Sequence, residues 1–416
     1  MIAEILSTGD EVLLGDILDT NSRFLCEKLK EMGVLVRQIT AVGDEVTDIS
    51  LTLKEIAQRA DICLVTGGLG PTQDDITALA CANAVEEKLL LNPKALASME
   101  IYFAKRGFEV TRDNRKQAML PESAGVLIND QGTAPGFFIS IDHCDFFFMP
   151  GVPSEMKAMF EDQVRPRVME IHGFTHEIPI ERLTVFGLPE SRVGSLLKGF
   201  EIKFPGMRLG FRAKFSLIEV KIVFPLGDGH SENMGEQMQE AKEWVVQRLE
   251  NKVISLTGKN LQEEVGKILR QKKHTLAIAE SCTGGLISNF VTDVPGSSDY
   301  FFFSAITYSN QAKVNILGVD IKTLETYGAV HEQTALEMAR GAKNAGKADW
   351  AISTTGIAGP GGGTEDKPVG TVCIGIVGPG FEKTRQYTFS FGNRAKNKEM
   401  FAAVALELLR RQLIDH

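Results

Sequence analysis

The chain has 416 residues, of which 43% are hydrophobic and 24% charged, and this composition is that of a soluble globular protein. Its length predicts about two or three domains. Acidic residues outnumber basic ones by 54 to 45, so the formal net charge of −9 argues against a general nucleic-acid surface, although it leaves room for a small phosphate pocket. The sequence has no basic leader and no apolar run of membrane-spanning length, so we expect a cytoplasmic protein without nucleic-acid or membrane partners.

The first block, residues 1–170, alternates short apolar runs with amphipathic segments. The runs that predict strands are residues 2–6, 34–40, 62–65 and 146–149, and the patterns that predict helices are residues 22–32 and 49–59. Alternation of this kind predicts a mostly parallel sheet that is covered by helices.

Two polar loops follow predicted strands in this block, and both are expected at the carboxyl edge of the sheet, where ligands bind. Glycines in the second loop permit positive φ and a close backbone approach to a phosphate. Carboxylates beside a phosphate predict a divalent cation that bridges the two. In the alternative interpretation, the carboxylates of the second loop are only charges that favour a helix N-terminus. The candidates are Gly67, Gly68 and Gly70 for phosphate, and Asp10, Glu11, Asp74 and Asp75 for metal.

The second block, residues 171–255, is predicted to be a small α+β domain. Its expected elements are strands at 182–186 and 215–224, helices at 190–197 and 232–249, and a turn at 227–229. Its charged residues are interpreted as a solvated face rather than a binding patch.

The third block, residues 256–416, begins with a predicted helix at 261–271. Residues 276–285 then form an apolar run that ends in Glu-Ser-Cys-Thr-Gly-Gly, a pattern that predicts a strand, a tight turn and a helix. This places Ser281 where a nucleophile or an anion-binding hydroxyl would stand. The simpler interpretation is that Ser281 and Thr283 cap the helix.

A nucleophilic serine needs a base, and no suitable histidine lies in this block. A lysine whose pKa is lowered by desolvation can take that role, and Lys313, with Tyr308 nearby, is the candidate. The glycine-rich stretch 355–363 offers backbone N–H groups for a phosphate or an oxyanion, and Arg394 could hold a phosphate. The six cysteines contain no Cys-x-x-Cys pair and are expected to be reduced and mainly structural, with catalytic Cys282 as a minor alternative.

With these motifs in order, residues 258–412 resemble the C-terminal domain of the CinA family, which is similar to nicotinamide mononucleotide deamidases. The resemblance implies an α/β Ser/Lys amidohydrolase domain that needs no cofactor. It implies Ser281 as nucleophile, Lys313 as base, Tyr308 as assistant, and Thr283, Gly284, Thr355, Gly356 and Arg394 as substrate-binding residues. Ser304-Ala305 and His331 depart from the family pattern, where glycines and a serine are usual.

The first block resembles molybdopterin-binding domains, and more closely the N-terminal domain of CinA proteins. Besides the two polar loops, the segments 19–22, 132–136 and 149–156 carry this resemblance. It implies a pyrophosphatase that acts on ADP-ribose with a bound divalent metal ion. We also expect a homo-oligomer, in the form of a dimer.

The sequence therefore predicts three α/β or α+β domains, at 1–170, 171–255 and 256–416, in an enzyme of pyridine-nucleotide salvage. Two other interpretations remain open. One is a non-catalytic adaptor for DNA recombination in competence, which would have no need of Ser281, Tyr308 and Lys313. The other is a molybdopterin-binding transferase, against which the fused amidase-like domain argues.

Overall fold

A computed structural model describes residues 1–172, 180–224, 234–389 and 391–416. The chain divides into two compact units. The first unit contains the N-terminal block, and the second contains the middle and C-terminal blocks together. The expected turn at 227–229 lies outside the described residues.

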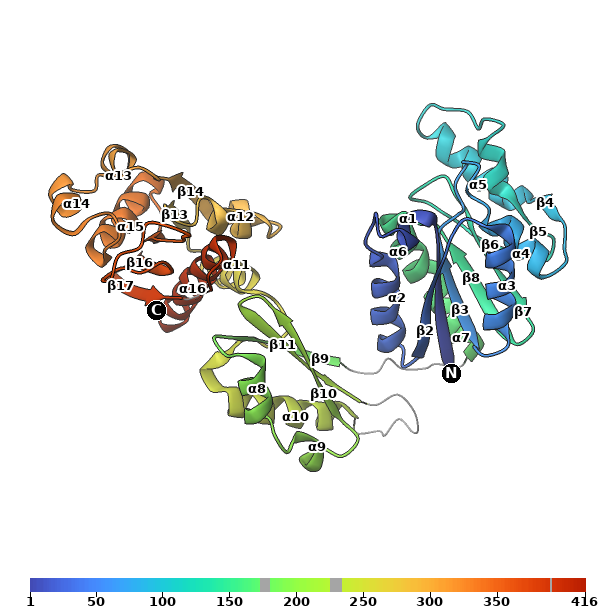
Figure 1. Cartoon of the computed structure of the whole chain (residues 1–416), viewed down its shortest axis with the longest axis horizontal. Coiled ribbons are helices and arrows are strands. Elements are labelled where there is room, and N and C mark those ends of the chain that lie inside the picture. The colour runs from blue at the N-terminus through green and yellow to red at the C-terminus, as the bar shows by residue number, and fades with distance from the viewer. Residues whose placement is uncertain (173–179, 225–233, 390) are drawn as a thin grey trace. The chain divides into compact units, whose positions relative to one another are not determined.

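The N-terminal unit is built on a six-stranded sheet with the order β2-β1-β3-β8-β7-β6 (Figure 1). Four neighbouring strands are parallel, and two at one edge are antiparallel. The parallel strands are β1 (Ile2–Thr8), β2 (Leu35–Val42), β3 (Ile62–Thr66) and β8 (Cys144–Met149), and the edge strands are β7 (Gly136–Ile141) and β6 (Gly125–Leu127). The short strands β4 (Leu89–Leu91) and β5 (Met119–Pro121) form a separate ribbon. The sheet is thus mostly parallel, as the sequence predicts.

Helices cover both faces of this sheet, because its central strands are apolar on both sides. Along β3, Cys63 and Val65 belong to one core, and Ile62 and Leu64 belong to the other. The helices over the first core are α3 (Val46–Ala57), α4 (Thr77–Ala84) and α5 (Pro93–Ala104). The second core is covered by α2 (Thr20–Glu31), α6 (Pro153–Met159), a π-helical turn (Phe160–Val164) and α7 (Arg165–His172), and the short helix α1 (Asp10–Leu13) follows β1.

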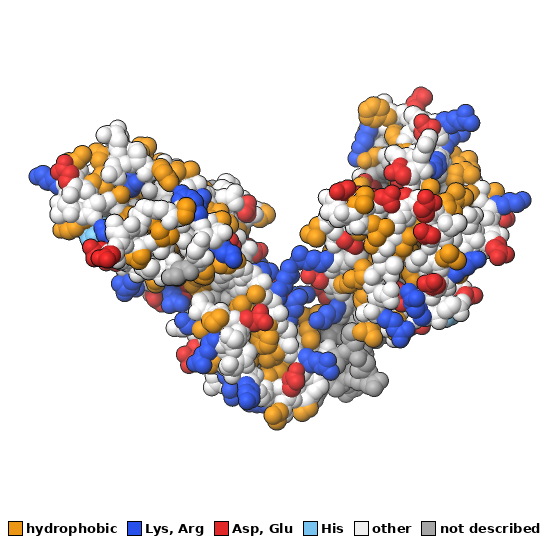
Figure 2. Space-filling view, in the orientation of Figure 1, with side chains coloured by type: hydrophobic (Ala, Val, Ile, Leu, Met, Phe, Trp, Pro, Cys, Tyr) orange, Lys and Arg blue, Asp and Glu red, His pale blue; other side chains and the backbone are white. Residues whose placement is uncertain are grey.

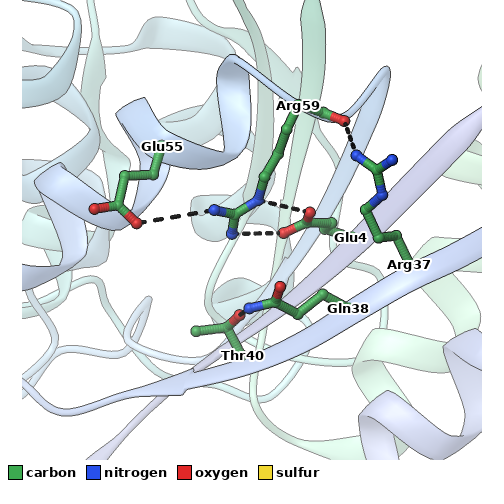
Figure 3. Close-up of polar contacts among 6 residues, drawn as sticks. All are labelled: Glu4, Arg37, Gln38, Thr40, Glu55 and Arg59. Atoms are coloured by element: carbon green, nitrogen blue, oxygen red, sulfur yellow. Dashed lines mark hydrogen bonds and ion pairs between the residues drawn. The ribbon is translucent and has the colours of Figure 1, made fainter.

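An ion pair with a buried carboxylate joins β1 to the chain just after α3 (Figure 3). The Glu4 side chain on β1 is fully buried, and its two oxygens accept from Arg59 Nε at 2.8 Å and from Arg59 Nη2 at 3.0 Å. Glu55 lies 3.9 Å from the same guanidinium, and Arg37 donates to the Arg59 carbonyl at 3.2 Å. This bidentate pair fixes the chain between α3 and β3, and so it fixes the strand that leads to the glycine loop.

The middle block forms a four-stranded sheet with the order β10-β11-β9-β12. Its strands are β9 (Ile180–Phe186), β10 (Arg208–Lys214), β11 (Leu217–Val223) and β12 (Val253–Ser255), and its helices are α8 (Glu190–Leu196), α9 (Phe200–Lys203) and α10 (Met234–Leu249). The predicted strand at 215–224 is wrong at its start. Phe215 and Ser216 form the two-residue turn between β10 and β11, and Ser216 takes a φ of +67° there.

The C-terminal sheet has the order β14-β13-β15-β16-β17, with the first three strands parallel and the last two antiparallel. Its strands are β13 (Leu276–Glu280), β14 (Phe301–Ile306), β15 (Trp350–Gly356), β16 (Thr371–Gly378) and β17 (Phe381–Thr388). Helices α11 (Leu261–Lys272), α12 (Leu286–Thr292) and α16 (Arg394–Asp415) contribute to the core on one face, and α13 (Asn310–Leu317), α14 (Ile321–Tyr327) and α15 (Glu332–Gly346) to the core on the other. Ser281 follows β13, between these two layers.

Candidate active site and a second, acidic site

Ser281 directly follows strand β13, at the carboxyl end of the parallel strands of the C-terminal sheet. The strand is buried between β14 and β15, and the Ser281 N–H continues its ladder by donating to the Thr354 carbonyl at 2.9 Å. Gly284 and Gly285 then take φ values of +61° and +93°, which let the chain turn directly into α12.

Glu280, which the sequence analysis passed over, is the residue that caps α12. Its fully buried carboxylate accepts from the backbone N–H groups of Gly285 at 2.9 Å and Ser288 at 2.9 Å. Ser288 Oγ also donates to it at 2.6 Å and lies 2.6 Å from Ser304 Oγ. The interpretation of Ser281 as a helix cap is therefore wrong, because a carboxylate already occupies the helix N-terminus.

Lys313 stands against Ser281. Ser309 caps the N-terminus of helix α13, where its hydroxyl accepts from the Ala312 N–H at 3.1 Å. Lys313 lies in the first turn of this helix. The ammonium nitrogen Nζ is 3.1 Å from Ser281 Oγ, 2.8 Å from the Thr307 carbonyl oxygen and 3.3 Å from the Tyr308 carbonyl oxygen. Only 1% of Lys313 is exposed, and this burial lowers its pKa from the usual lysine range.

This geometry suits a neutral amine that acts as a base. A neutral amine has two N–H groups, and it can donate one hydrogen bond to the carbonyl of Thr307 and one to the carbonyl of Tyr308. Its lone pair is then left to face the Ser281 hydroxyl. The arrangement can therefore deprotonate the serine without a histidine.

The neighbouring thiol is not prepared for the same chemistry. Cys282 is buried, and burial raises the pKa of its thiol to about 12. A thiolate is the reactive form of cysteine, so this environment disfavours Cys282 as the nucleophile. All six cysteines are free in the structure.

The predicted threonine ligands are engaged within the protein. Thr283 Oγ1 lies 2.7 Å from Thr354 Oγ1, and Thr355 Oγ1 donates to the Ala329 carbonyl at 2.7 Å. At most 1% of Thr283 or Thr355 is exposed, so their hydroxyls support the turn and the strand end in this structure. A Cβ at Gly356 would collide with the Thr371 carbonyl, which explains the glycine there. Substrate contact by these residues stays a prediction.

Arg394 and Tyr308 meet at the mouth of the site. Arg394 Nη1 donates to the Gly359 carbonyl at 2.6 Å, and Arg394 Nη2 donates to Tyr308 Oη at 3.1 Å. The first turn of α16 also contacts the glycine-rich stretch, because Asn397 Nδ2 donates to the Ala358 carbonyl at 3.1 Å. Arg394 therefore ties a helix start, a loop and the exposed Tyr308 ring together.

Lys398 is a cation that the sequence analysis missed. It lies one helical turn after Arg394, and a Cβ built on Gly284 would approach Lys398 Nζ to 3.4 Å. Arg394 and Lys398 line a hollow of about 680 Å³ together with Leu286, Phe290 and Glu399. The sequence does contain a signal for Lys398, because residues four apart at a helix start, such as Arg394 and Lys398, lie on one face of the helix.

The departure at His331 also has a structural explanation. Its ring nitrogen Nδ1 accepts from the Gln333 N–H at 3.0 Å, so the imidazole caps α15 as a serine hydroxyl could.

In the N-terminal unit, the glycine loop follows β3 as predicted. Gly67 and Gly68 have φ values of +107° and +64°, and a Cβ at either would collide with Thr8 or Thr77. The Asp75 carboxylate lies over Gly70 and accepts from the N–H of Thr72 at 2.8 Å and its hydroxyl at 2.6 Å. Asp75 is thus held inside its own loop.

The first acidic loop lies beside a carboxylate that was not predicted. The Asp10 N–H donates to Asp44 Oδ2 at 3.1 Å, and the Asp44 N–H donates to Asp10 Oδ1 at 3.2 Å. Partial burial raises the Asp44 pKa, and the charges of Asp10, Glu11 and Asp74 raise it further. Figure 2 shows acidic side chains grouped on the upper part of this unit in the view drawn.

Asp10, Glu11 and Asp74 are thus close enough to Asp44 to repel its charge, and a divalent cation relieves repulsion of this kind. Oxygen donors of this type suit a hard cation. Among the described residues, no three His, Cys, Asp or Glu side chains are already arranged as a metal site.

Comparison with known proteins identifies both parts of the chain. Residues 258–413 match the CinA C-terminal domain, and residues 4–170 match the probable molybdopterin binding domain. A CinA-like protein of Desulforapulum autotrophicum is 49% identical over 100% of this chain and 99% of its own. One of Desulfosudis oleivorans is 50% identical over the full length of both. A solved competence/damage inducible protein from Agrobacterium tumefaciens is 37% identical over 39% of this chain and 99% of its own, with a TM-score of 0.36.

None of the described helices is both long and apolar enough to cross a bilayer.

Proposed function

This chain belongs to the CinA family, and from that premise we propose that its C-terminal domain hydrolyses the carboxamide of nicotinamide mononucleotide to nicotinic acid mononucleotide and ammonia. The observation that carries the proposal is the buried Lys313 amine, 3.1 Å from Ser281 Oγ, with its pKa lowered by burial. A Ser/Lys hydrolase needs a nucleophilic serine and a lysine that can accept its proton, and these two residues are in contact here.

In the proposed reaction, Ser281 Oγ attacks the amide carbon while its proton passes to Lys313 Nζ. The tetrahedral intermediate collapses when the same ammonium returns that proton to the leaving nitrogen, so that ammonia departs and an acyl-serine remains. Water activated by the neutral amine then releases the acid and restores Ser281. The N–H of Thr283 has no acceptor among the described residues, so it is available to the oxyanion.

The cations beside the site favour a substrate with a phosphate. Arg394 and Lys398 share a hollow next to the Ser281 turn, and the open space suits a nucleotide rather than a free base. In this proposal the phosphate end of the mononucleotide lies against these two side chains, and the carboxamide reaches Ser281.

Ammonia release from nicotinamide mononucleotide by the purified full chain tests the proposal. We expect Ser281→Ala and Lys313→Ala to abolish turnover by similar factors, because nucleophile and base act as a unit. Cys282→Ala is the matched control at the adjacent position and should retain activity. Turnover that survives Ser281→Ala, or that is lost only in Cys282→Ala, would overturn the mechanism.

The role of the cations is tested separately. Arg394→Ala should raise KM or lower kcat/KM for the mononucleotide, and free nicotinamide should be a poor substrate. Equal turnover of free nicotinamide would contradict a phosphate-binding role.

We also propose that the N-terminal domain cleaves the pyrophosphate of ADP-ribose with a divalent cation. The supporting observation is the acidic group Asp10, Glu11, Asp44 and Asp74, together with a loop in which Gly67 and Gly68 take positive φ. Asp10, Glu11 and Asp44 would hold the cation, which would neutralise the diphosphate. The protein's part is to position the diphosphate along Gly67–Gly70.

Hydrolysis of ADP-ribose by the full chain, before and after chelation, tests this second activity. Asp44→Asn should weaken metal binding measured directly by calorimetry, whereas Asp16→Asn, a change to an exposed aspartate close to Asp10 and Glu11 in sequence, should not. Chelator-resistant cleavage, or unchanged metal binding in Asp44→Asn, would contradict it.

A further inference from the structure

A second large cavity lies within the C-terminal unit, away from Ser281. Its volume is about 640 Å³, and it opens to solvent between the middle block on one side and β17, the chain after it and α16 on the other. None of its lining residues lines the hollow beside Arg394. Cavities of this size at the boundary of two domains are the usual location of small-molecule sites.

Aromatic rings form much of its wall. From the middle block come Phe186 and Phe215, and from the end of β17 and the chain after it come Tyr387, Phe389 and Phe391. Consecutive rings of the second group are stacked, at 5.9 Å and 6.1 Å between centroids. Phe215 meets Phe391 edge to face at 5.3 Å, which closes the wall between the two blocks. Faces and edges of this kind accept a flat ring.

The polar groups of the cavity carry excess positive charge. Glu407 is 3% exposed and is already neutralised by two arginines, Arg410 at 2.6 Å and Arg411 at 2.7 Å. Lys214 shares Glu219 with Lys221, at 3.2 Å and 3.3 Å.

The third cation of the cavity is Lys252, which has no ion-pair partner among the described residues. The charged residues that line the cavity are thus three cations, Lys214, Lys252 and Arg411, and one carboxylate, Glu407. The balance favours an anionic group on the ligand.

We propose that this cavity is a binding site for a planar aromatic anion, a molecule with one flat ring system and one negatively charged group. The ring lies among Phe215, Phe389 and Phe391, and the charge lies toward Lys252. This site is separate from the proposed deamidase site and does not depend on that activity.

Fluorescence titration of the full chain with 1-anilinonaphthalene-8-sulfonate, an anion with a flat naphthalene ring and one sulfonate, tests the site. We expect one saturable site per chain. Ala213→Trp should fill the cavity and remove it, and Lys252→Glu should weaken binding roughly tenfold, as for one reversed charge at a partly screened distance. Lys259→Glu is the matched control, because Lys259 is exposed and lines no part of the cavity.

Competition separates ring from charge. Adenosine 5′-monophosphate should displace the dye at lower concentration than either adenosine or inorganic phosphate alone. Equal effects of Lys252→Glu and Lys259→Glu, or dye binding that survives Ala213→Trp in a chain with wild-type circular dichroism, would overturn the proposal. Loss of binding in Lys398→Ala but not in Lys252→Glu would also overturn it, because the dye would then occupy the other hollow.

Discussion

At the scale of single residues, the environment of Lys313 decides what the C-terminal site can do. A lysine in water is protonated at neutral pH and cannot accept a proton. Removing Lys313 from water disfavours its charged form, and two backbone carbonyls take its remaining N–H groups. Burial therefore converts an ordinary side chain into a base.

The pH dependence of deamidation should report this lysine. Because the neutral amine is the active form and burial lowers its pKa, kcat/KM should rise with pH and level off below 10.5, the ordinary lysine value. The acid limb should fit one proton. A rate that rises only above that ordinary value, or one independent of pH, would show that Lys313 is not the base.

At the scale of elements, two contacts that do not involve Ser281 hold chain segments close to the proposed sites in sequence. In the N-terminal unit, Arg59 is the only ion-pair partner of the fully buried Glu4 among the described residues. In the C-terminal unit, Phe215 at a hairpin tip packs on Phe391, three residues before Arg394.

Removal of the arginine should be costly, because it leaves a buried carboxylate without a partner. We expect Arg59→Ala to lower the free energy of unfolding by about 3 kcal/mol. Arg23→Ala is the control, since the Arg23–Glu27 pair is exposed and should contribute below about 0.5 kcal/mol. Addition of Glu4→Gln to Arg59→Ala should recover part of the loss in urea denaturation. Equal effects of the two arginine variants would contradict this account.

Truncation of the hairpin tip should be felt at the phosphate end of the deamidase site. Phe215→Ala removes the ring against which Phe391 rests, so Arg394 should become less well positioned. We expect KM for nicotinamide mononucleotide to rise about threefold to tenfold with a smaller change in kcat. Ile202→Ala, an exposed residue of the same domain, should change neither constant. A fall in kcat at constant KM would instead place the effect on the chemistry.

The sequence predicts well the strands and loops that hold the site residues. It predicts poorly the residues that contact them from other parts of the chain. Apolar runs that end in Ser, Gly and Asp locate β13, β3 and their loops, because strand ends are marked locally. Glu280, Asp44 and Lys398 were missed because their importance comes from what the fold brings near them. The sequence predicts a strand at Phe215–Ser216, where the structure has a hairpin turn, because Ser216 adopts a left-handed φ without being glycine.

At the scale of the whole molecule, the chain divides into two units with cores of their own. The two proposed activities should therefore be separable. Chelation should stop ADP-ribose cleavage and leave ammonia release intact, and Ser281→Ala should do the reverse. Both activities should be assayed on the same preparation. Loss of both activities on chelation would show that they share the metal.

The buried amine of Lys313 also bears on how firmly this unit is folded. In the unfolded chain lysine is protonated below 10.5, whereas the folded protein holds Lys313 at a lower pKa, so the unfolded state binds the extra proton. Stability is consequently lost as pH falls from 10.5 toward the folded value, and remains lower below it. Lys313→Met should gain in melting temperature over the wild type as pH is lowered, while Lys398→Met should show no such trend. The side chain that is needed for hydrolysis thus also lowers the stability of the fold. The inactive Lys313→Met variant should therefore have the higher melting temperature at low pH.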